Sequence, residues 1–129
     1  MVRTLDESRV GDVMTRNPIA VTPRTSVLEA ARLMRELGVS ALPVVDEERL
    51  VGIITERDLV WKVIAEERPT SIPVSDIMTR NLVVIREAET LSQALYLMSR
   101  FNIRHLPVVD EQGRLIGILS LRDIEYALI

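Results

Sequence analysis

The residues of this 129-residue chain with the clearest potential for chemistry form two short hydroxyl–acid motifs. Thr55-Glu56-Arg57-Asp58 and Ser120-Leu121-Arg122-Asp123 each carry a hydroxyl, an arginine and a carboxylate in the same order. A helix that begins at the hydroxyl residue offers unpaired backbone N–H groups and partial positive charge to a phosphate. The hydroxyl and the guanidinium can donate to that phosphate, and the carboxylate can accept both hydrogens of a vicinal diol.

The same two motifs also fit a purely structural role. A hydroxyl N-cap followed three residues later by an acid is a variant of the capping box. Capping boxes usually carry Glu or Gln at the third helical position, whereas both motifs keep Asp, and both place Arg directly before it. These two features favour a ligand role for Asp58 and Asp123, and capping and binding can coexist.

Both motifs lie at the same place in an internal repeat. Gly11–Asn17 recurs as Ser75–Asn81, and Leu42–Asp46 recurs as Leu106–Asp110. We expect a first repeat over residues 8–68, a linker over 69–74 and a second repeat over 75–129. Because each copy is marginal in size for independent folding, we expect the two copies to share one core, related by a pseudo-two-fold axis.

The hydrophobic periodicity within each copy predicts strand, helix, strand, strand and helix. In the first copy these elements are expected at 19–21, 27–37 (capped by Thr25 or Ser26 and stopped by Gly38), 42–45, 50–54 and 56–67; in the second they are expected at 82–85, 91–101, 106–109, 115–119 and from 121 to 129. The predicted fold class is therefore α/β, with two β-α-β-β-α repeats whose small sheets are covered by helices.

Composition excludes several classes of function. The chain has no cysteine and one histidine, His105, so it offers no thiolate nucleophile, Cys-based zinc site or paired-His metal site. We therefore expect no enzyme activity and no metal. The net charge of −3 and the 3% aromatic content argue against nucleic-acid binding. No apolar run is long enough to span a bilayer or to form a signal peptide, so we expect a cytoplasmic protein without membrane contact.

The motifs, taken in order and twice, resemble a tandem cystathionine-β-synthase-type domain pair, also called a CBS pair or Bateman module. The markers in the first copy are Asp-Val-Met-Thr, Gly-Val-Ser-Ala-Leu-Pro-Val-Val-Asp and Gly-Ile-Ile-Thr-Glu-Arg-Asp-Leu, and each has a counterpart in the second copy. The resemblance implies a standalone regulatory module with no catalytic cofactor. The implied ligand is AMP first, also ADP or ATP, and alternatively S-adenosylmethionine or NAD.

The resemblance further implies two nucleotide clefts between the copies, with ribose held by Asp58 in one and Asp123 in the other. Phosphate contacts are expected from Thr55, Arg57, Ser120, Arg122, Arg16, Arg80, Arg104 and His105. The adenine pocket is expected to comprise Ile53, Ile103, Val83, Leu82, Thr79, Ile118, Val39, Ser40, Ala41, Ile19, Pro18 and Thr15. We expect the Asp58 cleft to face Thr79 and Arg104-His105, which makes it the more basic cleft. The Asp123 cleft is expected to face Ser40-Ala41 and to bind polyphosphate more weakly.

We expect such modules to form a homodimer and to act on an effector protein that reads the ligand-dependent change, for example in energy sensing. The alternative is a structural dimerisation module without a physiological ligand, because the apolar helices could simply make an interface. A panel of melting temperatures with adenosine-containing ligands separates the two hypotheses, because a ligand that binds the native state raises the melting temperature.

Overall fold

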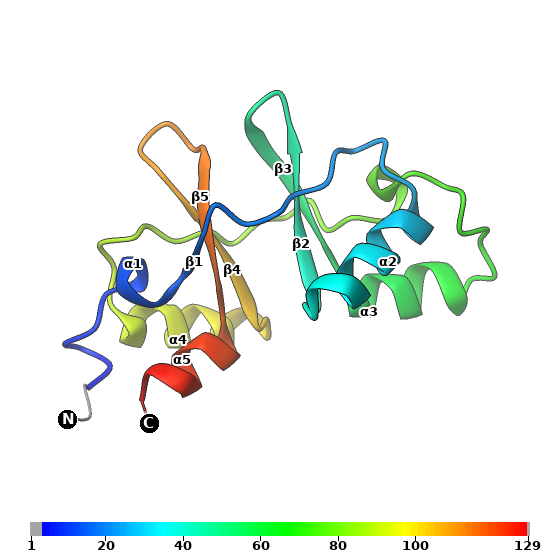
Figure 1. Cartoon of the computed structure of the whole chain (residues 1–129). Helices are drawn as coiled ribbons and strands as arrows, with labels where there is room; N and C mark the ends of the chain where they lie inside the picture. Colours follow the sequence, from blue (N-terminus) through cyan, green and yellow to red (C-terminus); the bar gives the residue numbers. More distant parts are fainter. Residues whose placement is uncertain (1–3, 129) are drawn as a thin grey trace. The chain divides into compact units, whose positions relative to one another are not determined.

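The computed structural model describes residues 4–128, which belong to two compact units (Figure 1). The first-hairpin unit spans Ile19–Leu82, and the second-hairpin unit combines the residues up to Pro18 with those from Val83 onward. The leading segment of each sequence repeat thus folds with the hairpin of the other repeat. Residue 129, at the end of the predicted second repeat, lies outside the described residues.

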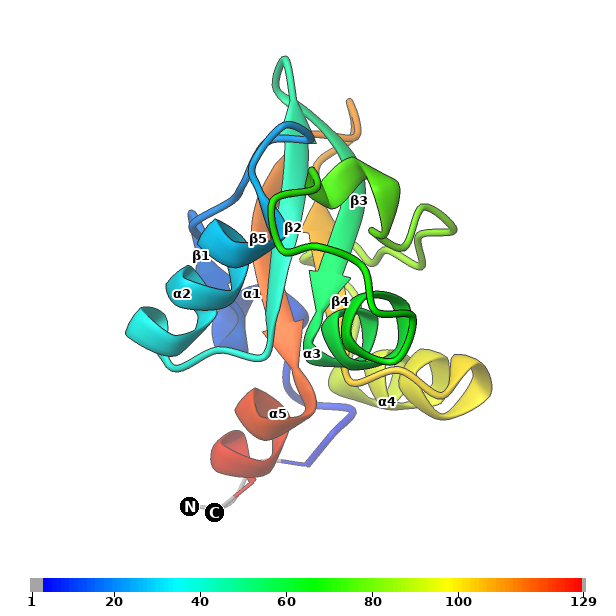
Figure 2. The ribbon, with the colours of Figure 1, turned by 90° about the vertical axis from the view of Figure 1, so that its right-hand side faces the viewer.

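The first-hairpin unit is built on an antiparallel pair of strands, β2 (Ala41–Asp46) and β3 (Arg49–Thr55). Helix α2 (Val27–Leu37) precedes the hairpin, and α3 (Glu56–Asp58) follows it and continues as a π-helix over Leu59–Ile64. A 3-10 turn, Val74–Asp76, comes later in the same unit. Figure 2 shows α2 and α3 flanking the hairpin.

Local signals set the ends of α2 as the sequence predicts. The Ser26 side chain accepts a hydrogen bond from the Glu29 N–H at 3.1 Å, which satisfies one of the backbone donors left unpaired at a helix start. Gly38 ends the helix in the left-handed conformation with φ of 67°, where a residue without Cβ is least strained. Ala30 and Met34 then lie on the buried face, one helical turn apart.

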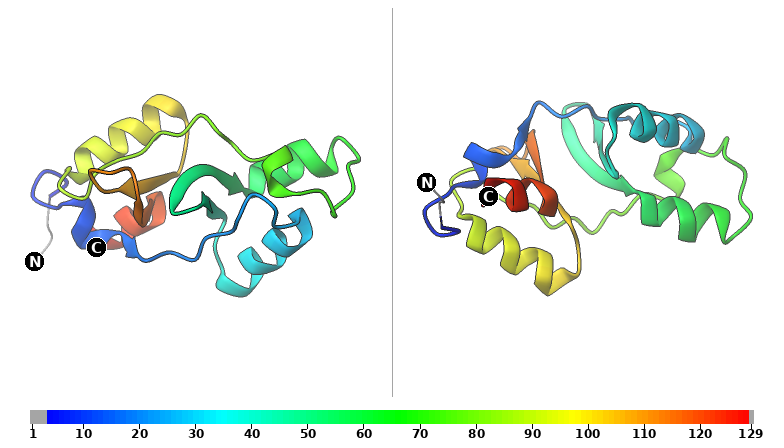
Figure 3. Two further views of the ribbon diagram at one scale, coloured as in Figure 1. Left: turned by 90° about the horizontal axis from the view of Figure 1, so that it is seen from above. Right: turned by 60° about the horizontal axis from the view of Figure 1, so that its bottom comes forward.

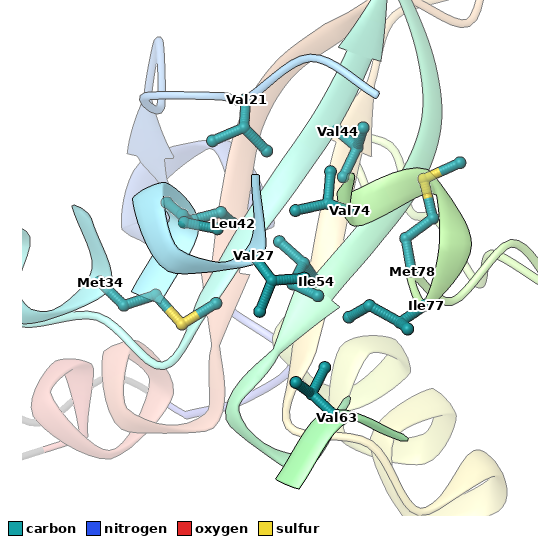
Figure 4. Close-up of a cluster of buried hydrophobic side chains, with 11 residues drawn as sticks. Val21, Val27, Met34, Leu42, Val44, Ile54, Val63, Val74, Ile77 and Met78 are labelled. Carbon is teal, nitrogen blue, oxygen red and sulfur yellow. The ribbon is translucent and has the colours of Figure 1, made fainter. Parts of the chain in front are cut away.

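Within residues 4–128 the buried hydrophobic side chains form two clusters, one in each unit, in place of the one core expected, and each cluster takes side chains from both sequence repeats. The cluster of the first-hairpin unit gathers side chains from α2, the two strands, the π-helix and the segment around the 3-10 turn (Figure 4). Its members are Val21, Val27, Ala30, Met34, Leu42, Val44, Ile54, Val63, Val74, Ile77 and Met78. Val74 at the end of the predicted linker and Ile77 and Met78 of the second sequence repeat add their apolar area to this cluster.

The second-hairpin unit contains a three-stranded antiparallel sheet in the order β1-β5-β4, with β1 at Thr15–Arg16, β4 at His105–Val109 and β5 at Leu115–Ser120. Its helices are α1 (Val10–Val13), α4 (Leu91–Phe101) and α5 (Leu121–Ala127). Helices α4 and α5 lie beside the β4–β5 hairpin (Figure 3). The core of this unit includes Val10 and Met14, which belong to the first sequence repeat.

Two predicted strands, 19–21 and 82–85, are reduced to single bridges, Val21 with Val44 and Ile85 with Val108. In each case a turn begins one residue after the bridge. The first turn is closed by the Thr25 N–H donating to the Thr22 carbonyl, and the second by the Glu89 N–H donating to the Arg86 carbonyl. The backbone leaves the edge of the hairpin at these turns, so the strands extend no further. The short elements α1, β1 and the 3-10 turn carry too little periodicity to be read from the sequence. No helix within residues 4–128 combines the length and apolar character needed to cross a bilayer.

Candidate ligand-binding site

The two hydroxyl–acid motifs form matching turns at which a strand ends and a helix begins. In the first turn, the Thr55 N–H donates to Asp58 Oδ2 at 2.9 Å, and the Asp58 N–H donates to Thr55 Oγ1 at 3.2 Å. In the second turn, the Ser120 N–H donates to Asp123 Oδ2 at 2.9 Å, and the Asp123 N–H donates to Ser120 Oγ at 3.1 Å. Both motifs are therefore reciprocal capping boxes, as the structural interpretation of the sequence predicts.

Asp58 is far more enclosed than a capping role requires. It is 4% exposed and is the one charged residue among the buried residues of the described chain. Besides the backbone of Thr55, its carboxylate accepts the hydroxyl of Thr55 at 3.1 Å and that of Thr79 at 3.1 Å. The Lys62 ammonium lies 2.7 Å from Asp58 Oδ1, which compensates the charge that burial would otherwise make costly.

Thr79 lies within reach of Asp58 because the segment that carries it packs against β3 through Met78. Ile53 and Thr79 exchange backbone hydrogen bonds of 3.0 and 2.8 Å, and Met78 lies directly over Gly52. A Cβ atom on Gly52 would stand 2.6 Å from Met78 Sδ, so only glycine leaves room for this approach. The Met-Thr motif and the glycine in β3 are thus two halves of one contact.

The second-hairpin unit has the same methionine–glycine contact, between Met14 and Gly117. A Cβ atom on Gly117 would stand 2.5 Å from Met14 Sδ, and Thr15 pairs with Ile118 in the β1–β5 ladder. Within residues 4–128, however, Thr15 makes no hydrogen bond to Asp123. The two turns therefore share a backbone frame and differ in what surrounds the carboxylate.

Strand pairing decides which residues flank each turn. His105 lies opposite Ser120 in the β4–β5 ladder, and the Leu121 N–H donates to the Arg104 carbonyl at 2.9 Å. In the other unit, Ala41 lies opposite Thr55, and the Glu56 N–H donates to the Ser40 carbonyl at 3.0 Å.

The sequence led us to expect Arg104-His105 to face Asp58, and Ser40-Ala41 to face Asp123, across clefts between the two copies, and this stays a prediction. Within each unit, an antiparallel hairpin brings the residues before its first strand to the end of its second, so Ser40-Ala41 adjoins the turn at Thr55 and Arg104-His105 adjoins the turn at Ser120. The basic pair thus adjoins Asp123. Burial lowers the pKa of His105; the charge of Asp123 opposes this shift and that of Arg104 adds to it.

Three arginines predicted to bind phosphate make contacts within the protein. The Arg57 guanidinium lies 5.1 Å from the centroid of the Trp61 ring, in a cation–π arrangement. Arg16 donates to the Gly11 carbonyl at 3.1 Å, and Arg80 donates to the carbonyl of Ser75, the residue equivalent to Gly11, at 2.8 Å. Arg16 also pairs with Glu87 at 3.3 Å. These contacts hold the arginine side chains against their own segments, and a role in phosphate binding stays a prediction.

The residues predicted to line an adenine pocket differ in exposure. Ile53 is buried at 8% exposure beside Thr79, whereas Ile19 and Val39 are 53% and 39% exposed. Val83 and Ile103 pack against the core of the second-hairpin unit. Pro18, Leu82 and Ile118 are half-buried. Ile53 and Ile118 lie on the strands that lead into the two turns, and a role for either in an adenine pocket stays a prediction.

Lys62 is a contact of the Asp58 carboxylate that the sequence did not lead us to predict. It is the single lysine of the chain and lies four residues after Asp58, on the same face of the helix. Its ammonium also donates to the Ile77 carbonyl at 3.0 Å. The spacing of four from an acid was the signal available in the sequence.

Comparison with known proteins gives a consistent result. The sequence model of the CBS domain family matches residues 10–65 and 74–129. The CBS domain-containing protein YhcV of Bacillus subtilis is 39% identical over 117 residues, which are 91% of this chain and 83% of YhcV. Inosine-5′-monophosphate dehydrogenase of Korarchaeum cryptofilum is 42% identical over 118 residues, but these are 92% of this chain and only 24% of that enzyme.

Solved structures include two relatives with bound ligands. The CBS domain pair of protein MJ0100, in complex with 5′-methylthioadenosine and S-adenosyl-L-methionine, superposes with a TM-score of 0.85 at 35% identity, covering 92% of this chain and 94% of that one. CBSX2 in complex with AMP superposes with a TM-score of 0.79 at 37% identity, again covering 92% and 94%.

Proposed function

The chain belongs to the CBS domain family, and we propose that it is a non-catalytic regulatory module that binds adenosine-containing ligands, with AMP as the preferred ligand. The observation that carries the proposal is the duplicated turn in which a hydroxyl cap precedes a carboxylate at the start of a helix. The complexes of MJ0100 with S-adenosyl-L-methionine and of CBSX2 with AMP support adenosine as the common chemical part.

The second turn offers the clearer place for a nucleotide. Among the residues that the structure describes, the Asp123 carboxylate accepts one hydrogen bond, from the Ser120 N–H. A carboxylate has about four acceptor positions, so a ribose diol can donate both of its hydrogens there. The Ser120 hydroxyl and the neighbouring Arg104 and His105 side chains supply donors for a phosphate.

Charge explains why we place AMP ahead of ATP. Each turn contains one carboxylate, and a longer chain of phosphates brings more negative charge close to it. Arg104 and Arg122 add positive charge beside Asp123, and both are exposed, so water and salt screen their attraction. A single phosphate therefore suits the local balance of charge better than three.

Calorimetric titration of AMP into the wild type, Asp58→Asn, Asp123→Asn and the double variant tests the proposal. Asparagine keeps the side-chain volume but replaces one acceptor oxygen with a donor, so each substitution should abolish binding at its own turn. The same titration with 2′-deoxy-AMP should be much weaker, because the diol has lost one hydroxyl. AMP binding that persists unchanged in the double variant would refute a ribose role for both carboxylates.

Ligand choice is tested by the melting temperature of the wild type with AMP, ADP, ATP, S-adenosylmethionine and NAD. We expect the largest increase with AMP, because preferential binding to the native state stabilises it in proportion to affinity. A larger increase with S-adenosylmethionine would reassign the preferred ligand within the same class. An unchanged melting temperature across the panel would favour the second candidate function.

The second candidate is a dimerisation module, and exposed apolar residues favour it. Val60, Trp61 and Ile64, on the helix that begins with α3, are 49%, 63% and 69% exposed. Aromatic residues in such patches commonly mark protein–protein contacts. We propose that this face contributes to a homodimer, and that an effector protein binds the homodimer differently when ligand is present. Light scattering of the wild type and of Trp61→Ala tests the dimer, which the substitution should weaken.

A further inference from the structure

The two turns differ in the donors that meet the carboxylate, and one of the donors at the first turn is a cation. Lys62 lies four residues after Asp58, and its ammonium is 2.7 Å from Asp58 Oδ1. The equivalent position after Asp123 is occupied by Ala127, which has no donor to offer. The first turn thus carries a cation of its own, and the second does not.

The acceptor positions of Asp58 are filled by the protein itself. Oδ2 accepts the N–H and the hydroxyl of Thr55, and Oδ1 accepts the hydroxyl of Thr79 and the ammonium of Lys62. These four donors match the roughly four lone-pair positions of a carboxylate. A ribose diol can therefore bind Asp58 only by displacing at least one of them.

Lys62 is the donor best able to leave. The Thr55 N–H is fixed by the backbone, and the two threonine hydroxyls are short and half-buried. The Lys62 side chain is long and 45% exposed, so its ammonium can be hydrated when it moves. It also lines an open groove of about 390 Å³ together with Glu66, whose carboxylate can accept the displaced ammonium, and with Asp76, which pairs with Arg68 at 3.6 Å.

We infer that Lys62 is a displaceable internal ligand of Asp58, which competes with the ribose diol and makes the first turn the weaker of two unequal nucleotide sites. This inference rests on the proposed function and adds how nucleotide binding at the two sites is regulated. The Asp123 site fills at lower nucleotide concentration, and the Asp58 site fills only when the nucleotide outcompetes Lys62. Displacement also breaks the hydrogen bond from Lys62 to the Ile77 carbonyl, so occupancy of the first site changes the restraint on the segment that carries Thr79.

The test isolates one site at a time. In an Asp123→Asn background, Lys62→Met keeps the apolar stem and removes the ammonium, and AMP should bind about tenfold more tightly than to Asp123→Asn alone. A factor of ten corresponds to about 1.4 kcal/mol. The reciprocal variant, Ala127→Lys in an Asp58→Asn background, should bind AMP about tenfold more weakly than Asp58→Asn alone. Unchanged affinity in either comparison would overturn the inference.

The single lysine allows a direct readout of displacement. In Asp123→Asn protein labelled with [¹³Cε]-lysine, one lysine signal is expected, and saturating AMP should shift it toward that of a hydrated lysine. The same addition to the Asp58→Asn/Asp123→Asn protein should leave the signal unchanged. A lysine signal that stays fixed while AMP binds to Asp123→Asn would refute displacement and leave the proposed function intact. If the wild type and every variant fail to bind AMP, the proposed function itself falls, and the inference falls with it.

Discussion

Truncation of the two equivalent carboxylates should destabilise the protein to different degrees. Asp58→Ala removes the acceptor of four hydrogen bonds, one of them from a charged partner, whereas Asp123→Ala removes the acceptor of one. The two positions share the capping box and the strand-to-helix turn, so the comparison holds local structure constant. What differs is the number of donors left without an acceptor.

The expected magnitudes follow from the number of hydrogen bonds lost. Each lost hydrogen bond costs about 1 kcal/mol net, and the half-exposed Lys62 recovers part of its share by hydration. We therefore expect Asp58→Ala to lower the free energy of unfolding by about 3 kcal/mol and Asp123→Ala by about 1 kcal/mol. For a chain of this length 1 kcal/mol corresponds to about 4 °C, which gives losses of about 12 °C and 4 °C in melting temperature.

Urea unfolding followed by circular dichroism, with a melting curve for each variant, measures the difference. Asp58→Ala in a Lys62→Met background provides the control, because the contribution of the ion pair is then already absent and the loss should shrink. Equal losses for Asp58→Ala and Asp123→Ala would refute the unequal enclosure of the two carboxylates. A larger loss for Asp123→Ala would do so more strongly.

Three further predictions concern glycine packing, pH and helix capping. Gly52→Ala should cost about 1–3 kcal/mol in urea unfolding and weaken AMP binding, because its Cβ meets Met78 Sδ at 2.6 Å and the Thr79 carbonyl oxygen at 3.2 Å. Gly38→Ala, with open space but a positive φ, should cost about 1 kcal/mol with AMP binding retained, and equal binding by both variants would contradict the packing argument. Burial lowers the pKa of His105, so the unfolded chain binds a proton there at higher pH than the folded protein. The free energy of unfolding should therefore fall as the pH drops below about 6.5. Between about pH 7.5 and 5.5, the melting temperature of His105→Gln should change less with pH than that of the wild type. An equal change in both proteins would contradict this prediction. Thr90→Ala should cost about 1 kcal/mol by removing the cap of α4, whereas the exposed Ser99→Ala on the same helix should be nearly neutral, as thermal melts can show.

Most regular elements could be predicted because their signals are local. Ser26, Thr55, Thr90 and Ser120 each cap a helix through a backbone N–H three residues later, and that spacing is visible in any sequence. Gly38 and Asn102 end helices in the left-handed conformation for equally local reasons. The predicted strands at 19–21 and 82–85 were wrong because their extent depends on pairing with a distant hairpin edge.

The candidate site divides in the same way. The repeated hydroxyl–acid turn and its capping geometry follow from residues three positions apart, whereas Thr79 and the strand neighbours of each turn come from other segments. Strand register places Arg104 and His105 beside Ser120 within the second-hairpin unit, a neighbourhood that the sequence did not predict. Lys62 was within local reach of Asp58, but its importance depends on the burial of that carboxylate, which periodicity does not report.

The sequence by itself determined the duplication, the α/β elements and the two carboxylates at helix starts, because repeats, caps and periodicity are encoded within a few residues. Only the tertiary structure decided that Met78 packs on Gly52 and that Met14 packs on Gly117. Through these contacts the leading segment of each repeat folds with the hairpin of the other repeat. The physical reason is that such pairings are chosen by the fit and burial of apolar side chains distant in the chain. The pairing in the first-hairpin unit also brings the Thr79 hydroxyl to Asp58, which meets four donors within residues 4–128, whereas Asp123 meets one.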